Sequence, residues 1–111
     1  MKTFIGEAKG PGPGRVVISE PGAPRRRLTH RMRHSLDGFR WGYEGSGPAD
    51  LALSLLHDVL GKEPPPAMYQ AFKSEVIAKL PFDKWSLHET VIRSWIKSYE
   101  LELAEPAGDA A

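Results

Sequence analysis

The stretch that decides the fold runs from Phe39 to Leu56 and reads FRWGYEGSGPADLALSLL. Its first part, residues 39–43, alternates aromatic with polar or small residues, which is the period of a strand with one apolar face. The pattern then changes, because Ser46 is a good helix N-cap and Pro48 is tolerated in a first helical turn. Leucines follow at helical spacing as far as Gly61, a typical helix stop. The stretch therefore predicts a strand that feeds directly into an α-helix.

Two shorter β-rich segments, Thr3–Ile5 and Val16–Ile18, lie upstream of this stretch. Between them, residues 9–14 read KGPGPG, a run that neither a helix nor a central strand tolerates. We expect the two segments to pair as an antiparallel hairpin with a long loop.

Two more helices are predicted downstream. Met68, Phe72 and Leu80 belong to an apolar ladder with four-residue spacing that Pro81 ends. Ser86 and Glu89 have the spacing of a capping box, so the last helix is expected to begin at Ser86.

Strands first and helices afterwards indicate an α+β protein. We expect a small antiparallel sheet of about three N-terminal strands, covered by three C-terminal helices. A length of 111 residues favours one domain, placed at residues 1–104, with a flexible tail at residues 105–111.

Composition excludes several classes of protein. The chain contains no cysteine, so disulfides and thiolate chemistry are impossible. No apolar segment is long enough for a signal peptide core or a membrane span, which makes a cytoplasmic protein the expectation. The net charge of +1 hides an asymmetry. Residues 1–46 carry nine Lys or Arg and four Asp or Glu (+5), whereas residues 47–111 carry six and ten (−4).

Residues 34–56 also carry a resemblance to a known family. The pattern His-Ser-x-x-Gly-Phe-x-Trp-Gly-Tyr-x-Gly-Ser-Gly-Pro, followed by Leu-Ala-Leu, resembles the central signature of a domain-of-unknown-function family, number six-one-six-six. Tyr69, Phe72 and Trp85 lie in segments similar to the family's second helix and its end. The resemblance covers roughly residues 30–96 and the first strand. It implies a small protein borne by phages, plasmids and other mobile elements, and it implies no activity.

The basic segment from Arg25 to His34 is a candidate contact for another macromolecule. Arginine forks bind phosphates and carboxylates and stack on aromatic rings. The segment could contact nucleic acid or an acidic protein surface, or it could be a solvated loop or edge strand whose charges deter aggregation. The predicted contact residues are Arg25, Arg26, Arg27, Arg31, Arg33, Arg40, Trp41 and Tyr43.

The turn Gly45-Ser46-Gly47 is a weaker candidate for an anion site. Free N–H groups at a helix start can hold a phosphate. The turn lacks the lysine of a phosphate-binding loop and the spacing of a dinucleotide fingerprint. Asp50 in the first turn favours the helix dipole but would repel a bound anion. The turn is therefore expected mainly to join strand and helix.

Catalytic and metal sites have no comparable pattern. The four histidines include only one close pair, His30 and His34, and no clustered carboxylates accompany them. We expect no catalytic residue, no metal and no cofactor.

The functional expectation is a non-enzymatic accessory protein that binds another protein or a nucleoprotein, for example to inhibit a host defence complex. An acidic helix face (Asp50, Asp58, Glu63 and Glu75) is one candidate contact. A nucleic-acid-binding module and a small phosphate-binding protein remain alternatives. The surplus apolar residues of the last helix are compatible with a monomer or a homodimer.

Overall fold

A computed structural model describes residues 1–104 of the chain, and the predicted tail at residues 105–111 lies outside the described residues. The elements follow in the order β1 (Thr3–Glu7), β2 (Arg15–Ser19), β3 (Arg26–Arg27), α1 (Ser46–Leu60), α2 (Pro66–Glu75), the 3₁₀ turn η1 (Ile77–Lys79), β4 (Lys84–His88) and α3 (Glu89–Ala104). The protein is α+β, as predicted, with one more strand than the sequence suggested.

The four strands form one antiparallel sheet in the order β3-β2-β1-β4. The predicted hairpin is confirmed, because β1 pairs with β2 across the glycine- and proline-rich loop. On its other side β1 pairs with β4, so Ile5 lies opposite both Val17 of β2 and Ser86 of β4. The first strand of the chain is therefore held between a local and a distant partner.

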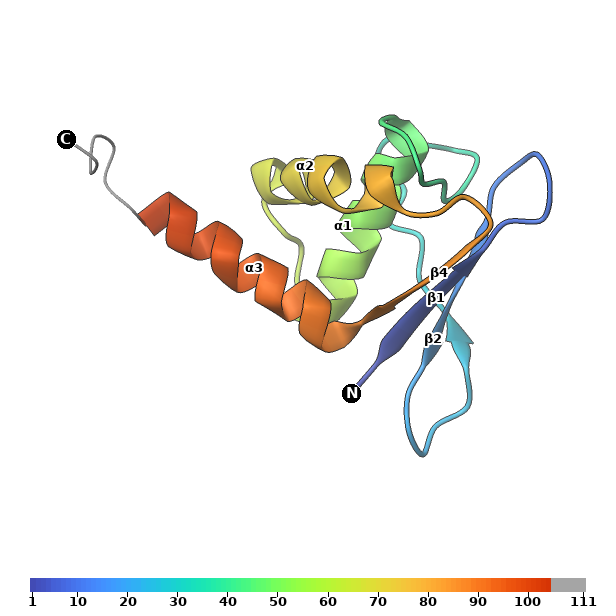
Figure 1. Ribbon diagram of the computed structural model, residues 1–111, viewed down its shortest axis with the longest axis horizontal. Coiled ribbons are helices and arrows are strands. Elements are labelled where there is room, and N and C mark those ends of the chain that lie inside the picture. Colours follow the sequence, from blue (N-terminus) through green and yellow to red (C-terminus); the bar gives the residue numbers. More distant parts are fainter. Residues whose placement is uncertain (105–111) are drawn as a thin grey trace.

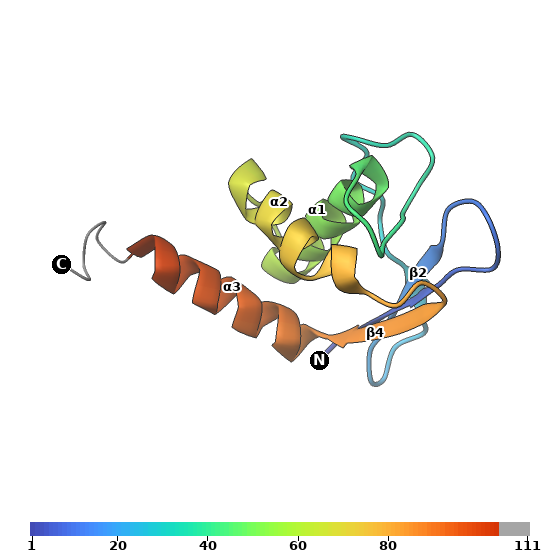
Figure 2. The same ribbon diagram turned by 45° about the horizontal axis from the view of Figure 1, so that its top comes forward.

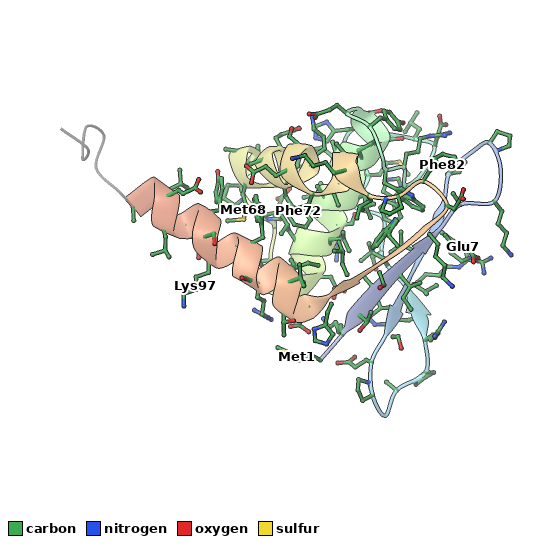
Figure 3. The ribbon with its side chains drawn as sticks, viewed as in Figure 1. Met1, Glu7, Met68, Phe72, Phe82 and Lys97 are labelled. Atoms are coloured by element: carbon green, nitrogen blue, oxygen red, sulfur yellow. The ribbon has the colours of Figure 1, made fainter. Side chains whose placement is uncertain are left out.

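All three helices lie on one side of the sheet (Figure 1). The strand residues that face them are buried, including Phe4, Val16, Ile18 and Trp85. In Figure 3, Met68 and Phe72 project from α2 towards α3, and the Phe72 ring lies 4.9 Å from that of Trp95. One apolar core thus fills the space between the sheet and the helical layer.

Helix α1 is the central helix of this layer, and every residue from Gly47 to Leu56 is buried. Gly61 ends it in the left-handed conformation, with φ 74° and its N–H donating to the His57 carbonyl. The N-cap prediction was wrong by one residue, because Gly45 occupies that position and Ser46 is already helical. Within residues 1–104, no helix combines the length and apolar character needed to cross a bilayer.

The predicted strand at residues 39–43 was wrong. Phe39 and Trp41 are buried, as the alternation suggested, but only Phe39 forms an isolated bridge, with Gly14. Positive φ angles at Gly38 (104°) and Gly42 (84°) turn the backbone on either side. The segment is an irregular loop whose aromatic rings reach the core, so alternation here records burial rather than strand pairing.

The predicted capping box was also wrong. Ser86 lies within β4, and α3 begins at Glu89. The Glu89 N–H donates to the Lys2 carbonyl (2.8 Å), and its carboxylate accepts the Lys2 N–H (3.0 Å). Glu89 therefore extends the β1–β4 ladder by one pair instead of folding back onto Ser86. Helix α3 then projects away from the rest of the protein (Figure 2).

Candidate binding surface

The carboxylate of Asp50 organises the loop that carries the predicted contact residues. Asp50 is completely buried in α1. Its oxygens accept the backbone N–H groups of Arg33 (3.2 Å), His34 (2.8 Å) and Ser35 (2.9 Å), and the ring nitrogen Nε2 of His30 lies 2.8 Å away. A buried carboxylate needs such donors, because leaving it unpaired in the core costs several kcal/mol.

Two further bonds fasten the same loop to the helices. The Ser54 hydroxyl of α1 accepts the Arg31 N–H at 2.9 Å. The His34 ring nitrogen Nε2 lies 2.7 Å from the Tyr69 hydroxyl of α2. The basic segment is thus a fixed part of the fold, which its composition alone did not reveal.

The predicted arginines do not form one cluster. Arg26 faces the helical layer and forms an ion pair with Asp58 at 3.3 Å. Arg33 forms an ion pair with Glu63. These two ion pairs connect the basic segment to α1 and to the turn that follows α1.

Arg25 and Arg27 instead accompany two cations that the sequence reading missed, Arg15 of β2 and Lys84 of β4. Arg15 and Lys84 lie opposite Glu7 of β1, one on each side. Arg27 lies opposite Val17. Ile5, Glu7, Arg15, Val17, Arg25 and Lys84 line a shallow hollow of about 270 Å³. We call this surface, including Arg27, the open basic face.

The open basic face has no cover among residues 1–104, because the helices lie on the other side of the sheet (Figure 1). Figure 3 places Glu7 on this side of the sheet. Within the described part of the chain, none of its four cations forms an ion pair, whereas Glu7 lies 3.8 Å from Lys9. Four positive side chains thus surround one carboxylate and a half-buried apolar centre, Ile5 and Val17.

The aromatic members of the predicted contact set differ in exposure. Trp41 is buried, with its indole N–H donating to the Phe82 carbonyl at 2.8 Å, so its ring is not available for stacking on a partner. Tyr43 is 48% exposed. It lies with Arg40 and Phe82 around a small hollow beside the β1–β2 loop, apart from the open basic face.

The turn Gly45-Ser46-Gly47 is occupied by the protein itself. Gly47 is buried, and a Cβ atom placed on it would lie 2.8 Å from the Cβ of Arg40. The Arg40 side chain therefore covers this part of the helix start. The expectation that the glycines permit close packing agrees with this geometry.

Glu44, next to the turn, ties the loop to α2. Its carboxylate accepts a hydrogen bond from the Ser74 hydroxyl (2.9 Å) and lies 3.3 Å from Lys73 Nζ. The Ser74 bond and then Lys73 hold the pKa of Glu44 below its ordinary value.

The four carboxylates of the proposed acidic helix face differ in exposure, since only Glu63 and Glu75 are exposed, and a contact through them stays a prediction. Asp50 is buried inside the loop network. Asp58 is 14% exposed and bound to Lys2 and Arg26, while Glu63 is paired with Arg33. Only Glu75 is bound to an uncharged partner, accepting the Trp95 indole N–H at 3.0 Å. These carboxylates hold the fold together.

Helix α3 keeps some apolar surface. Trp95 and Tyr99 stack on each other with ring centres 5.2 Å apart, whereas Val91, Leu101 and Leu103 are exposed. Whether the protein is a monomer or a homodimer stays a prediction, which light scattering on the purified protein tests. Among residues 1–104, no three His, Cys, Asp or Glu side chains are grouped closely enough to hold a metal ion.

The missed cations could have been found only in part. Arg15 adjoins a predicted strand, so its position on the outer face follows from the alternation with Val16 and Ile18. Lys84 could not be placed, because it lies between Pro81, where one predicted helix ends, and Ser86, where the next is expected to begin.

Comparison with known proteins gives one match. The sequence model of a family described as "Family of unknown function (DUF6166)" matches residues 8–98, from the end of β1 into α3. No curated protein and no solved structure matches the chain. The matched range contains the loop network around Asp50 and all four cations of the open basic face. The chain therefore belongs to this family of unknown function, DUF6166.

Proposed function

We propose that this chain is a small non-enzymatic protein that binds an anionic macromolecule through the open basic face. The observation that carries the proposal is a group of four cations on the sheet face opposite the helices, none of them ion-paired within residues 1–104: Arg15, Arg25, Arg27 and Lys84. These four side chains can donate charge-assisted hydrogen bonds to the carboxylates or phosphates of a partner, and such bonds are stronger than those between neutral groups.

An acidic protein surface fits this face better than nucleic acid bases do. The centre is apolar, with Ile5 and Val17, and arginines surround it, as in many protein interfaces. Among the residues that line the hollow there is no aromatic ring, so the face lacks the aromatic platform on which the bases of single strands usually stack. The proposed partner is therefore another protein or a nucleoprotein whose contact surface carries carboxylates.

The proposal extends to the biological setting. We place the protein inside the cell as an accessory factor of a phage or another mobile element, and a host defence complex that it inhibits is one partner of the required kind. The support is its small size and its sequence resemblance. The gene neighbourhood tests the setting: defence-system genes beside it favour this role, and metabolic genes argue against it.

Charge reversal on the face tests the binding proposal. Arg25→Glu combined with Lys84→Glu changes the net charge by −4 within the open basic face. Lys62→Glu combined with Lys97→Glu makes the same change at exposed positions elsewhere (Figure 3 shows Lys97 on α3). We expect a partner captured by wild type to be lost by the first variant and kept by the second. Equal capture by both double variants, measured with the purified partner, would contradict the proposal.

Nucleic acid is the second candidate, because the same four cations could neutralise phosphates. Four such contacts predict that the affinity falls about 100-fold between 50 and 200 mM salt, through counterion release. Fluorescence anisotropy with single- and double-stranded DNA and RNA measures this. Absence of binding at 50 mM salt removes nucleic acid and leaves the acidic protein.

A further inference from the structure

A second hollow, of about 320 Å³, lies beside the open basic face. Three segments that are distant in sequence form it: the start of β2 at Arg15, the end of β3 at Arg27 with His30 beyond it, and the loop at residues 37–39. Its volume lies at the lower end of the range of small-molecule sites.

His30 is held in this hollow by the buried carboxylate of Asp50. The ring nitrogen Nε2 lies 2.8 Å from Asp50 Oδ2, and the ring packs against Phe39 with centres 4.8 Å apart. The carboxylate accepts the Nε2–H proton, which fixes the ring and leaves Nδ1 as the nitrogen available to a ligand. The His30 ring is therefore already oriented in the absence of a ligand.

The charges and the floor of the hollow define what would fit. Arg15 and Arg27 contribute two guanidinium groups that form no ion pair within residues 1–104, and the His30 ring adds a further hydrogen-bonding nitrogen. Phe39 and Leu28 provide apolar floor. Asp37 is the one carboxylate in the lining, and it can accept a hydrogen bond from a hydroxyl or an amino group of a ligand.

We propose that this hollow binds a phosphomonoester of a small organic molecule that also carries a hydrogen-bond donor, such as a nucleoside monophosphate. The two guanidinium forks suit the three outer oxygens and the double charge of a phosphomonoester better than the two oxygens of a carboxylate. The apolar floor accepts the organic part, and Asp37 selects for a donor on it.

The site is separate from the proposed macromolecular contact, although it shares Arg15 and Arg27 with it. His30 and Phe39 line only this hollow. Arg25 and Lys84 line only the open basic face. Variants at these positions therefore distinguish a failure of the phosphomonoester proposal from a failure of the partner-binding proposal.

Titration calorimetry and amide NMR on the full chain test the proposal. The probes are inorganic phosphate, a nucleoside 5′-monophosphate, the same nucleoside without phosphate, and a short oligonucleotide with and without a 5′-phosphate. We expect saturable binding of the monophosphate but not of the nucleoside, with amide shifts at residues 14–16, 27–30 and 37–39. A preference for the 5′-phosphorylated oligonucleotide would identify a strand end as the source of the same phosphate group.

Three variants refine the test. His30→Gln keeps a donor for Asp50 and Arg27→Ala removes an exposed side chain, so at least one of them should fold. Each should weaken monophosphate binding about tenfold, the effect of one charge-assisted hydrogen bond. Arg25→Ala is the matched control and should leave binding unchanged. The proposal is overturned if no phosphorylated probe saturates at 10 mM, or if folded His30→Gln and Arg27→Ala bind as tightly as wild type.

Discussion

The buried carboxylate of Asp50 accepts the backbone N–H groups of residues 33–35, which would otherwise need water as their hydrogen-bond partner. Its three backbone donors and His30 all come from a loop 15 to 20 residues earlier in the chain. The position was predicted to be a first-turn residue that favours the helix dipole. It instead connects α1 to the basic segment, and through His30 it holds one wall of the second hollow.

We predict that Asp50→Asn lowers the free energy of unfolding by about 2–4 kcal/mol, because an amide nitrogen would face backbone N–H donors in the core. Urea unfolding measures the change, and faster hydrogen exchange at Arg33–Ser35 should accompany it. Asp37→Asn, at an exposed position, is the control and should stay within about 0.5 kcal/mol of wild type. Equal stability of the two variants would contradict the role given to Asp50.

Gly6 shows a second constraint at the scale of single residues. It lies in the centre of β1 opposite Trp85, and a Cβ atom built on it would lie 2.1 Å from the Trp85 ring. The indole therefore rests directly on the β1 backbone, which only glycine permits here.

Gly6→Ala is expected to destabilise the protein by about 2–3 kcal/mol, through displacement of Trp85 from the core. Gly10→Ala is the comparison, because nothing lies within 4 Å of its Cβ position and only its φ of 84° opposes the change. That strain costs about 1 kcal/mol. Chemical unfolding followed by tryptophan fluorescence should separate the two, and a larger loss for Gly10→Ala would refute the packing argument.

Among the elements, the junction between β4 and α3 combines a strand end with a helix start. The Glu89 carboxylate accepts the Lys2 N–H and lies 2.7 Å from Arg93 Nε, one turn along α3. The Lys2 N–H, and then Arg93, hold the pKa of Glu89 below its ordinary value of 4.5. The ionised carboxylate therefore stabilises the folded state.

Glu89→Gln should cost about 1–2 kcal/mol at neutral pH, where the carboxylate is ionised in both states. Because the folded pKa is lowered, the contribution is complete above pH 4.5 and disappears as the pH falls through the folded pKa. The stability difference between wild type and variant should therefore narrow in acid. Urea midpoints measured between pH 7 and pH 3 test this, and a constant difference would contradict it.

For the whole molecule, the pairing of β1 with β4 closes the fold. Strand β1 lies between β2, its hairpin partner, and β4, which follows about 80 residues later in the chain. Helix α1 lies on one side of this sheet, with the other helices. The hairpin and the helical layer bury their apolar sides only against each other. We therefore predict that residues 1–104 fold as a single cooperative unit.

We expect far-UV circular dichroism and tryptophan fluorescence to report the same unfolding transition, as a two-state domain requires. Two of the three tryptophans, Trp41 and Trp85, lie at the sheet with ring centres 5.4 Å apart, and Trp95 lies on α3, whereas the dichroism signal comes mainly from the helices. Two separate transitions would show that sheet and helices unfold independently. Removal of β4 and α3 should leave a chain without a stable fold.

The sequence by itself determined the features that depend on neighbouring residues. The hairpin, the bounds of α1 to within a residue and the α+β class all follow from local periodicity, turn residues and helix stops. The apolar ladder also located α2, but the helix ends at Glu75 and a separate 3₁₀ turn carries the chain towards Pro81, where the sequence had predicted the end. The family resemblance also came mainly from one local pattern, residues 34–56, and the match over residues 8–98 confirms the family.

Only the tertiary structure decided the rest, because those features join residues far apart in the chain. Residues 84–88 form a strand because β1 supplies their backbone hydrogen-bond partners, although the pattern of residues 86–89 favoured a helix start. The arginines of one short segment were divided by their partners, with Arg26 and Arg33 bound to acids near α1 and Arg25 and Arg27 left on the open basic face. Composition records how many charges a chain has, but the fold determines which of them remain free to bind a partner.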